Sequence, residues 1–231
     1  MSVEITSLHN PRIKELVKLR KRRVRDARRL TLVEGVRECL QALAHGGVPV
    51  EAYVCPPLRA KATDQAASQA LDEQLASLAA AGPTRAYDVT PQVFAKAAYR
   101  DESDGVLLVL PYGDIGLDAL PIADTPFYAV IEGVEKPGNL GAILRTADAA
   151  GAHGVIVAQA PDRPATDLYN PNVVRASLGA LFSVPTAEAS SAETIDWLRA
   201  HGTSIVAATP DAAMRYTEAA LTGAVAVVLG S

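Results

Sequence analysis

The sequence has little of what several common classes of protein require. Its 231 residues include only two cysteines, Cys39 and Cys55, and four histidines without a ligand-like spacing. Neither a disulfide framework nor a metal site is therefore expected. No stretch approaches the roughly 20 consecutive apolar residues of a membrane helix, and the first residues lack the basic start and apolar core of a signal peptide. The composition predicts a globular cytoplasmic protein without a bound metal.

What the sequence does contain suits one large or two small α/β domains. Hydrophobic residues make up 49% of the chain, which is enough to build real cores. Turn-forming residues cluster between 111 and 126, between two hydrophobic regions. We therefore predict two domains, residues 1–118 and 119–231.

The first domain is predicted to be a small α/β module. Asn10 and Pro11 indicate a helix start, with Asn as the cap and Pro in the first turn. Short apolar runs predict strands, and longer amphipathic stretches predict helices. The expected strands are 30–33, 50–54, 84–89 and 105–110, and the other expected helices are 34–45 and a stretch within 59–81.

The second domain is predicted to contain a parallel sheet. Short apolar runs alternate there with segments of helical character, a pattern typical of parallel strands with helices on both faces. The expected strands are 127–132, 154–158, 181–184, 203–208 and 224–229.

A dense basic segment begins the chain. Ten basic residues and two acidic ones lie between positions 12 and 29, a local charge of +8 in a chain whose net charge is −4. Such an asymmetry indicates a surface that holds a polyanion, and phosphate contacts of this kind depend on salt and not on sequence. The alternative is a solvated helix face without function. The candidate RNA-binding residues are Arg12, Lys14, Lys18, Arg20, Lys21, Arg22, Arg23, Arg25, Arg28 and Arg29.

Residues 137–151 have the position of a crossover helix in a βαβ unit. They follow the apolar run 127–131 and precede the run 155–158. Asn139 is a good candidate for the N-cap, and Gly151 fits the position just after the helix end.

Arg145 is the only basic residue on this helix. Its neighbours one turn back, Gly141 and Ala142, are small and would leave room for a planar or anionic group beside the guanidinium. The alternative is an exposed ion pair with Asp148, three residues on, which would have no functional meaning.

Residues 139–151, Asn-Leu-Gly-Ala-Ile-Leu-Arg-Thr-Ala-Asp-Ala-Ala-Gly, resemble the first motif of the SpoU (TrmH-type) branch of the SPOUT superfamily. The Asn, Gly, Arg, Ala and Gly residues all fall at the spacing of that family. Residues 174–185 are similar to a second family segment, and residues 34–37 with the basic helix look like its N-terminal substrate-binding module. Members of the family are RNA ribose 2′-O-methyltransferases that use S-adenosylmethionine.

The resemblance implies roles for several residues. It assigns Arg145 to the ribose 2′-hydroxyl, and Asn139 would orient Arg145 or the ribose, a role compatible with helix capping. Because a neutral guanidine is costly near pH 7, we favour hydrogen-bond donation by Arg145 to the developing oxyanion or the adjoining phosphate. The residues implied to hold the adenosyl group end two strands: Ala208, Thr209, Leu229 and Gly230.

The resemblance also implies a trefoil knot and a homodimer. In the family the second motif continues beyond the equivalent of Leu229 and Gly230, and a third motif follows, whereas the printed sequence ends at Ser231. The expected catalytic domain is therefore a SPOUT-type α/β domain without its C-terminal motifs, which in the family include the tail that threads the knot.

The leading hypothesis is an S-adenosylmethionine-dependent RNA 2′-O-ribose methyltransferase. Ribosomal RNA is favoured over transfer RNA because this kind of N-terminal domain accompanies many rRNA-directed members. The alternative is a non-catalytic RNA-binding protein derived from the family. A Rossmann-type nucleotide enzyme fits the βαβ pattern, but residues 138–141 do not give its Gly-x-Gly-x-x-Gly phosphate turn.

Overall fold

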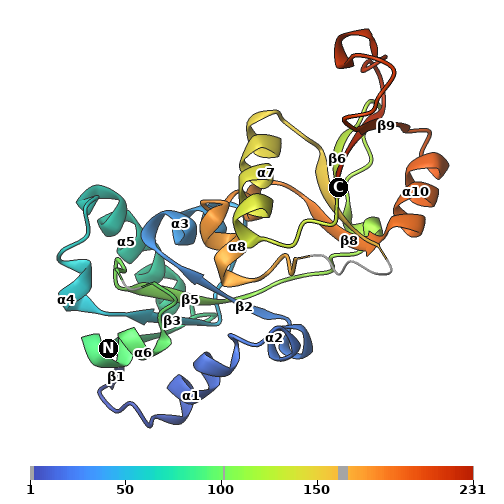
Figure 1. The fold of residues 1–231 in the computed structure, drawn as a ribbon. Helices are drawn as coiled ribbons and strands as arrows, with labels where there is room; N and C mark the ends of the chain where they lie inside the picture. The colour runs from blue at the N-terminus through green and yellow to red at the C-terminus, as the bar shows by residue number, and fades with distance from the viewer. Residues whose placement is uncertain (1–2, 101, 161–165, 231) are drawn as a thin grey trace.

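The computed structural model describes residues 3–100, 102–160 and 166–230, which form two five-stranded sheets (Figure 1). The first sheet has the order β1-β4-β3-β5-β2. Strand β4 pairs in parallel with β1 and β3, whereas β5 runs antiparallel to β3 and β2. Its strands are β1 (Val3–Ile5), β2 (Leu30–Glu34), β3 (Glu51–Val54), β4 (Arg85–Val89) and β5 (Val106–Pro111).

The helices of this half differ from the prediction in two respects. They are α1 (Pro11–Lys18), α2 (Arg22–Arg28), α3 (Val36–Ala44), α4 (Pro56–Arg59), α5 (Gln65–Ala81) and α6 (Pro91–Ala97). The single basic helix is two helices, because the Arg25 guanidinium donates to the carbonyls of Leu19 and Arg20 and stabilises a break between them. The short helices α4 and α6 were not predicted. The helix predicted within 59–81 is confirmed as α5, which the Asp64 side chain caps by accepting from the Ala67 amide.

The second sheet is entirely parallel, as predicted, in the order β8-β7-β6-β10-β9. Its strands are β6 (Phe127–Glu132), β7 (Gly154–Gln159), β8 (Thr186–Ser190), β9 (Ser204–Ala208) and β10 (Val225–Gly230). The helices are α7 (Pro137–Ala149), α8 (Pro171–Ala176), α9 (Ala180–Ser183) and α10 (Ser191–Ala200), with the 3-10 turns η1 (Leu117–Ala119) and η2 (Tyr216–Glu218).

Helices cover both faces of this sheet, which confirms the predicted α/β class. Ile131 and Val157 share a core with Leu140 of α7, and the alternate residues Val130 and Ile156 pack with α10 on the other face.

The prediction of a strand at 181–184 is wrong. These residues fall within and after the short helix α9, because Gly179 turns the chain at a φ of +87° and the Ser177 hydroxyl accepts from the Leu181 amide. The strand follows at Thr186–Ser190. A short apolar run does not by itself distinguish a buried helix from a buried strand.

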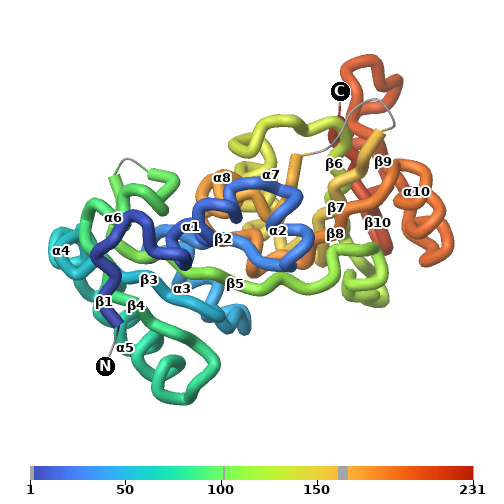
Figure 2. Tube along the Cα trace, turned by 90° about the horizontal axis from the view of Figure 1, so that it is seen from below, coloured from blue at the N-terminus to red at the C-terminus, as the bar shows by residue number. Residues whose placement is uncertain are grey.

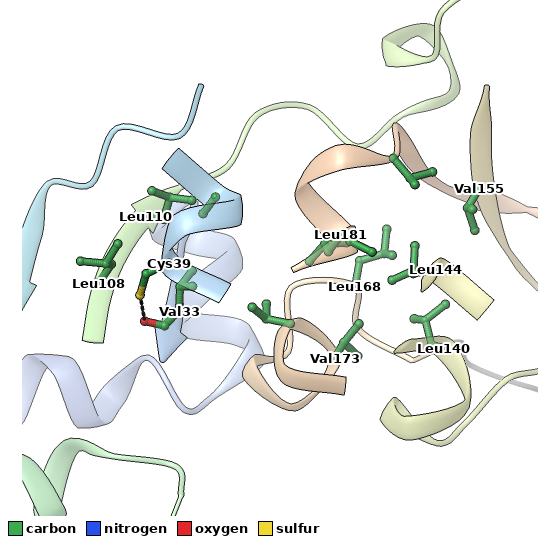
Figure 3. Packing of buried hydrophobic residues seen from close by; sticks show 14 of the residues in the cluster. Val33, Cys39, Leu108, Leu110, Leu140, Leu144, Val155, Leu168, Val173 and Leu181 are labelled. Atoms are coloured by element: carbon green, nitrogen blue, oxygen red, sulfur yellow. Dashed lines mark hydrogen bonds between the residues drawn. The ribbon is translucent and has the colours of Figure 1, made fainter. Parts of the chain in front are cut away.

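One hydrophobic core joins the two halves. It includes Val33 and Cys39 from the first half and Leu168, Val173 and Leu181 from the second (Figure 3). Helix α2 lies at the junction (Figure 2), where Arg22 forms an ion pair with Glu188 of β8 and Arg25 with Asp167 in the loop before α8. Within the described ranges, no helix is both long and apolar enough to cross a membrane.

Candidate active site

A cavity of about 450 Å³ opens at the carboxyl ends of β6 and β10. This is the edge at which parallel sheets commonly bind ligands. The lining combines apolar side chains, exposed backbone and three charged groups. It consists of Ile131, Glu132, Gly133, Val134, Glu135, Lys136, Asn139, Ile143, Leu229 and Gly230.

The charged groups of the cavity give it an acidic character. Two carboxylates, Glu132 and Glu135, stand against one ammonium group, Lys136. Glu132 accepts a hydrogen bond from the Ser191 hydroxyl at the start of α10, which fixes its side chain. Gly230 lies close to the same residue, since a Cβ atom there would be 3.1 Å from the Glu132 carbonyl oxygen. Glu132, Glu135 and Lys136 were not predicted as site residues, although their position at and just after the end of β6 is a signal for such a site.

Asn139 lines this cavity but does not cap α7. The helix begins two residues earlier, at Pro137, and its N-cap residue is Lys136, with no side-chain cap. The prediction of an Asn139 cap is wrong because proline fixes φ near the helical value and takes the first helical position itself. The Asn139 side chain is exposed, and no partner is recorded for it among the described residues.

Arg145 is exposed on the third turn of α7 and reaches α8 rather than Asp148. One of its terminal nitrogens donates to the carbonyl oxygen of Ala176, at the end of α8. Asp148 instead accepts from the Ser183 hydroxyl at 2.8 Å. The described lining of the cavity does not include Arg145. The contact with Ala176 leaves the other donors of the guanidinium available.

The room expected beside Arg145 is filled by the protein itself. A Cβ atom on Gly141 would lie 2.5 Å from the carbonyl carbon of Ala176 and 2.7 Å from the amide nitrogen of Ser177. Gly141 therefore allows α7 and α8 to approach closely and does not leave space for a ligand. The close approach brings the Ala176 carbonyl within reach of Arg145.

We expect Gly141→Ala to lower the free energy of unfolding by about 1–3 kcal/mol, because the added methyl group meets backbone that can move only with α8. Gly138→Ala is the matched control: it lies on the same helix, and its Cβ would have no neighbour within 4 Å. Urea denaturation of both variants measures the difference. Equal stability of the two variants would contradict the packing role of Gly141.

The other predicted donor-binding residues lie at the same sheet edge but divide into two groups. Leu229 and Gly230 line the cavity, whereas Ala208 and Thr209 are exposed at the end of β9 and are not part of the described lining. Ala208 is the register partner of Leu229, so the two strand ends are adjacent. Ser231 lies outside the described residues.

Most side chains of the basic segment have partners within the protein. Carboxylate partners are Glu51 for Arg12, Glu15 for Lys18 and Arg28, Asp26 and Glu188 for Arg22, and Asp167 for Arg25. Arg20 and Arg29 donate to backbone carbonyls. Lys14, Lys21 and Arg23 are exposed, and in the described part of the chain no partner is recorded for them. These three are the freest cations of the predicted RNA-binding surface.

Arg25 departs from that prediction. Arg25 is only 1% exposed, and its guanidinium forms an ion pair with Asp167 of the second half. Burial raises the pKa of Asp167, whereas the neighbouring Arg25 and Arg22 lower it. Arg25 holds the two halves together and is not accessible to a polyanion. Nothing in the sequence pairs it with Asp167, which lies in a loop 142 residues away.

Polar contacts reinforce this junction. The Thr31 hydroxyl donates to the Tyr169 carbonyl at 2.8 Å, and the Tyr112 and Tyr169 rings stack with centroids 4.0 Å apart. These contacts join β2 and the residue after β5 to the loop that precedes α8. Among the described residues, no group of three or more potential metal ligands is found.

Comparison with known proteins finds two family models on the chain. The model of the SpoU rRNA Methylase family matches residues 126–231, and that of the MRM3-like substrate binding domain matches residues 10–108.

Solved structures are similar over nearly the whole chain. One described as an RNA 2′-O ribose methyltransferase has 37% identity and a TM-score of 0.78, with 99% of this chain and 81% of that chain covered. An AdoMet-bound rRNA methyltransferase from Sinorhizobium meliloti has 28% identity and a TM-score of 0.81, with coverages of 97% and 79%.

Among curated proteins, a 23S rRNA (uridine(2479)-2'-O)-methyltransferase from Streptomyces viridochromogenes is 44% identical over 94 residues, which are 39% of this chain and 31% of that protein. The chain spans less than half the length of the curated relatives that it matches.

Proposed function

Because the chain belongs to the SpoU family of rRNA methylases, we propose that it transfers a methyl group from S-adenosylmethionine to a ribose 2′-hydroxyl of RNA. The observation that supports this proposal most strongly is the placement of two residues on α7. Asn139 lines the cavity at the ends of β6 and β10, and Arg145 is exposed to solvent about two turns later. Ribosomal RNA is the favoured substrate, because relatives of the chain are named for methylation of 23S rRNA.

The cavity fits the methyl donor. Its volume of about 450 Å³ lies in the range of small-molecule sites. Apolar side chains such as Val134, Ile143 and Leu229 suit an adenine ring, and the excess of carboxylate suits a cationic ligand. Leu229 and Gly230 would contact the donor directly, with Ala208 and Thr209 at the neighbouring strand end.

Bound S-adenosylmethionine would supply a methyl group on a sulfonium. The residues of the chain would then align the accepting oxygen and stabilise the negative charge that develops on it. The hydroxyl proton would pass to solvent, and the donor would leave as the thioether S-adenosylhomocysteine. Arg145 is suited to this role because a guanidinium carries a positive charge and several hydrogen-bond donors. The Ala176 carbonyl uses one of them and orients the group. Asn139 would position the ribose or the donor at the mouth of the cavity.

The arrangement of the whole protein is also part of the proposal. We assign residues 1–118 to RNA binding and residues 119–231 to catalysis, supported by the separate sheets of the two halves. Lys14, Lys21 and Arg23 would contact phosphates. By its family the protein would form a homodimer with a trefoil knot, and an rRNA-directed activity would place it in the cytoplasm.

The first test is calorimetric titration of the protein with S-adenosylmethionine and with its product, S-adenosylhomocysteine. We expect both to bind at one site per chain. Leu229→Lys adds a cation to the cavity wall. We expect it to lower the affinity for S-adenosylmethionine, which carries a sulfonium, at least about tenfold, and to lower the affinity for S-adenosylhomocysteine, a neutral thioether, by less.

The matched control is Leu221→Lys, because Leu221 is 44% exposed, close to the 40% of Leu229, and is not in the described lining. A folded protein that binds neither ligand would contradict methyl transfer and favour the non-catalytic RNA-binding alternative. Binding unaffected by Leu229→Lys would place the donor elsewhere.

A further inference from the structure

A second cavity, of about 570 Å³, lies in the first half of the protein between α1 and the sheet. It has an apolar interior and a rim of charged side chains. The described lining is Pro11, Arg12, Glu15, Leu16, Leu19, Arg28, Leu30, Val50, Glu51, Gly82, Pro83, Arg85 and Val109. All of these residues precede the catalytic half, so the cavity is distinct from the one at α7.

One wall of this cavity is a guanidinium held in a fixed stack. The Arg12 Cζ atom lies 4.9 Å from the centroid of the Tyr87 ring. An ion pair of 2.6 Å with Glu51 prevents the group from rotating away, and Glu51 is itself fixed by the Tyr53 hydroxyl at 2.7 Å. Tyr53 also stacks on Tyr87, with centroids 5.3 Å apart. Arg12 is thus immobilised on one planar face, and its side chain stays 41% exposed.

The rest of the cavity complements a flat, uncharged ring with a negative charge attached. Leu16 and Val109 give an apolar floor, and Val50 lies 37% exposed near the opening. Arg85 is exposed, and within the described ranges no side-chain partner is recorded for it. Arg28, paired with Glu15, is the third cation of the described lining, after Arg12 and Arg85.

We propose that this cavity binds one unpaired nucleobase of the RNA, stacked against Arg12, with the flanking phosphate beside Arg85. Proteins recognise single-stranded RNA by stacking its bases on aromatic rings and on arginine planes, and every base offers a suitable face. This proposal rests on the proposed function, because it assumes that the substrate of the protein is RNA. It adds a base-binding anchor apart from the reacting ribose.

The test compares two labelled oligonucleotides of equal charge by fluorescence anisotropy at low salt. One is hexauridylate, and the other is a hexamer of abasic tetrahydrofuran phosphates. We expect the 231-residue chain to bind the uridine hexamer about tenfold more tightly than the abasic hexamer, which is the magnitude of one base stack. Equal affinity for the two hexamers would overturn the proposal.

Arg12→Lys keeps the charge and the partner Glu51 but removes the planar group. We expect it to lose the preference for the uridine hexamer and to keep the salt dependence of binding. Arg29→Lys is the matched control, since Arg29 lies over Tyr112 at 5.0 Å in the same basic segment but is not in the cavity lining. A preference retained in Arg12→Lys, or lost equally in Arg29→Lys, would overturn the proposal.

Arg85→Ala keeps the proposal falsifiable if Arg12→Lys disturbs the fold. We expect this variant to bind both hexamers more weakly, with a smaller salt slope and an unchanged preference for bases. If the wild-type protein prefers the uridine hexamer and Arg85→Ala loses that preference, the stacking role of Arg12 is contradicted. Equal affinity of the wild-type protein for the two hexamers, together with intact methyl transfer to ribosomal RNA, would refute the anchor alone. Failure to bind the methyl donor would refute the proposed function alone.

Discussion

Arg145→Ala is expected to lower the rate of methyl transfer at saturating RNA at least about a hundredfold and to leave RNA affinity nearly unchanged. The magnitude is that of removing a donor aimed at charge that develops in a transition state. RNA affinity should persist because the candidate phosphate contacts, Lys14, Lys21 and Arg23, lie on the other half of the protein. Single-turnover transfer of labelled methyl groups to ribosomal RNA, together with filter binding, separates the two effects.

Two further variants make this result specific. Arg145→Lys keeps the charge but not the forked donors, so it should recover only a small part of the activity. Arg199→Ala removes an exposed arginine of α10 outside the cavity lining and should retain full activity. Transfer by Arg145→Ala at the wild-type rate would exclude Arg145 from the mechanism. Parallel losses of transfer and RNA affinity would make it a binding residue.

The fold could be predicted to the extent that periodicity and turn residues determine it. The parallel strands β6 and β7 and the crossover helix α7 follow from apolar runs separated by glycine and proline. The segment 181–184 could not be assigned in this way, since its helical form depends on the left-handed turn at Gly179.

The candidate site was predicted only in part, because its remaining features depend on contacts between distant segments. Asn139, Leu229 and Gly230 do line one cavity, as a shared sheet edge suggests. The prediction that Gly141 leaves room for a ligand beside Arg145 is wrong, because α8 occupies that space, and sequence alone could not show this contact. The burial of Arg25 could not be predicted either, because a run of basic residues does not indicate which of their side chains is buried.

Arg25→Leu is expected to lower the free energy of unfolding by about 3–5 kcal/mol, the usual cost of leaving one member of a buried ion pair unpaired. The variant also removes the donors to the Leu19 and Arg20 carbonyls. Arg23→Leu, at an exposed position on the same helix, should change stability little. Urea denaturation at pH 7 compares the variants, and similar stability of Arg25→Leu and Arg23→Leu would contradict the structural role of Arg25.

The pH dependence of the Arg25→Leu variant identifies the unpaired carboxylate as the cause. Burial already raises the pKa of Asp167, and without Arg25, which lowers it, the pKa must rise further. At pH values between the pKa of Asp167 in the unfolded state, about 3.9, and its raised pKa in the native variant, the native state binds more protons than the unfolded state. The free energy of unfolding then increases as pH falls through this window. The deficit of Arg25→Leu should therefore shrink as the pH falls from 7 toward the pKa of an unfolded aspartate, whereas Arg25→Leu combined with Asp167→Asn should show no such recovery. A deficit independent of pH would attribute the loss to the missing carbonyl contacts and not to Asp167.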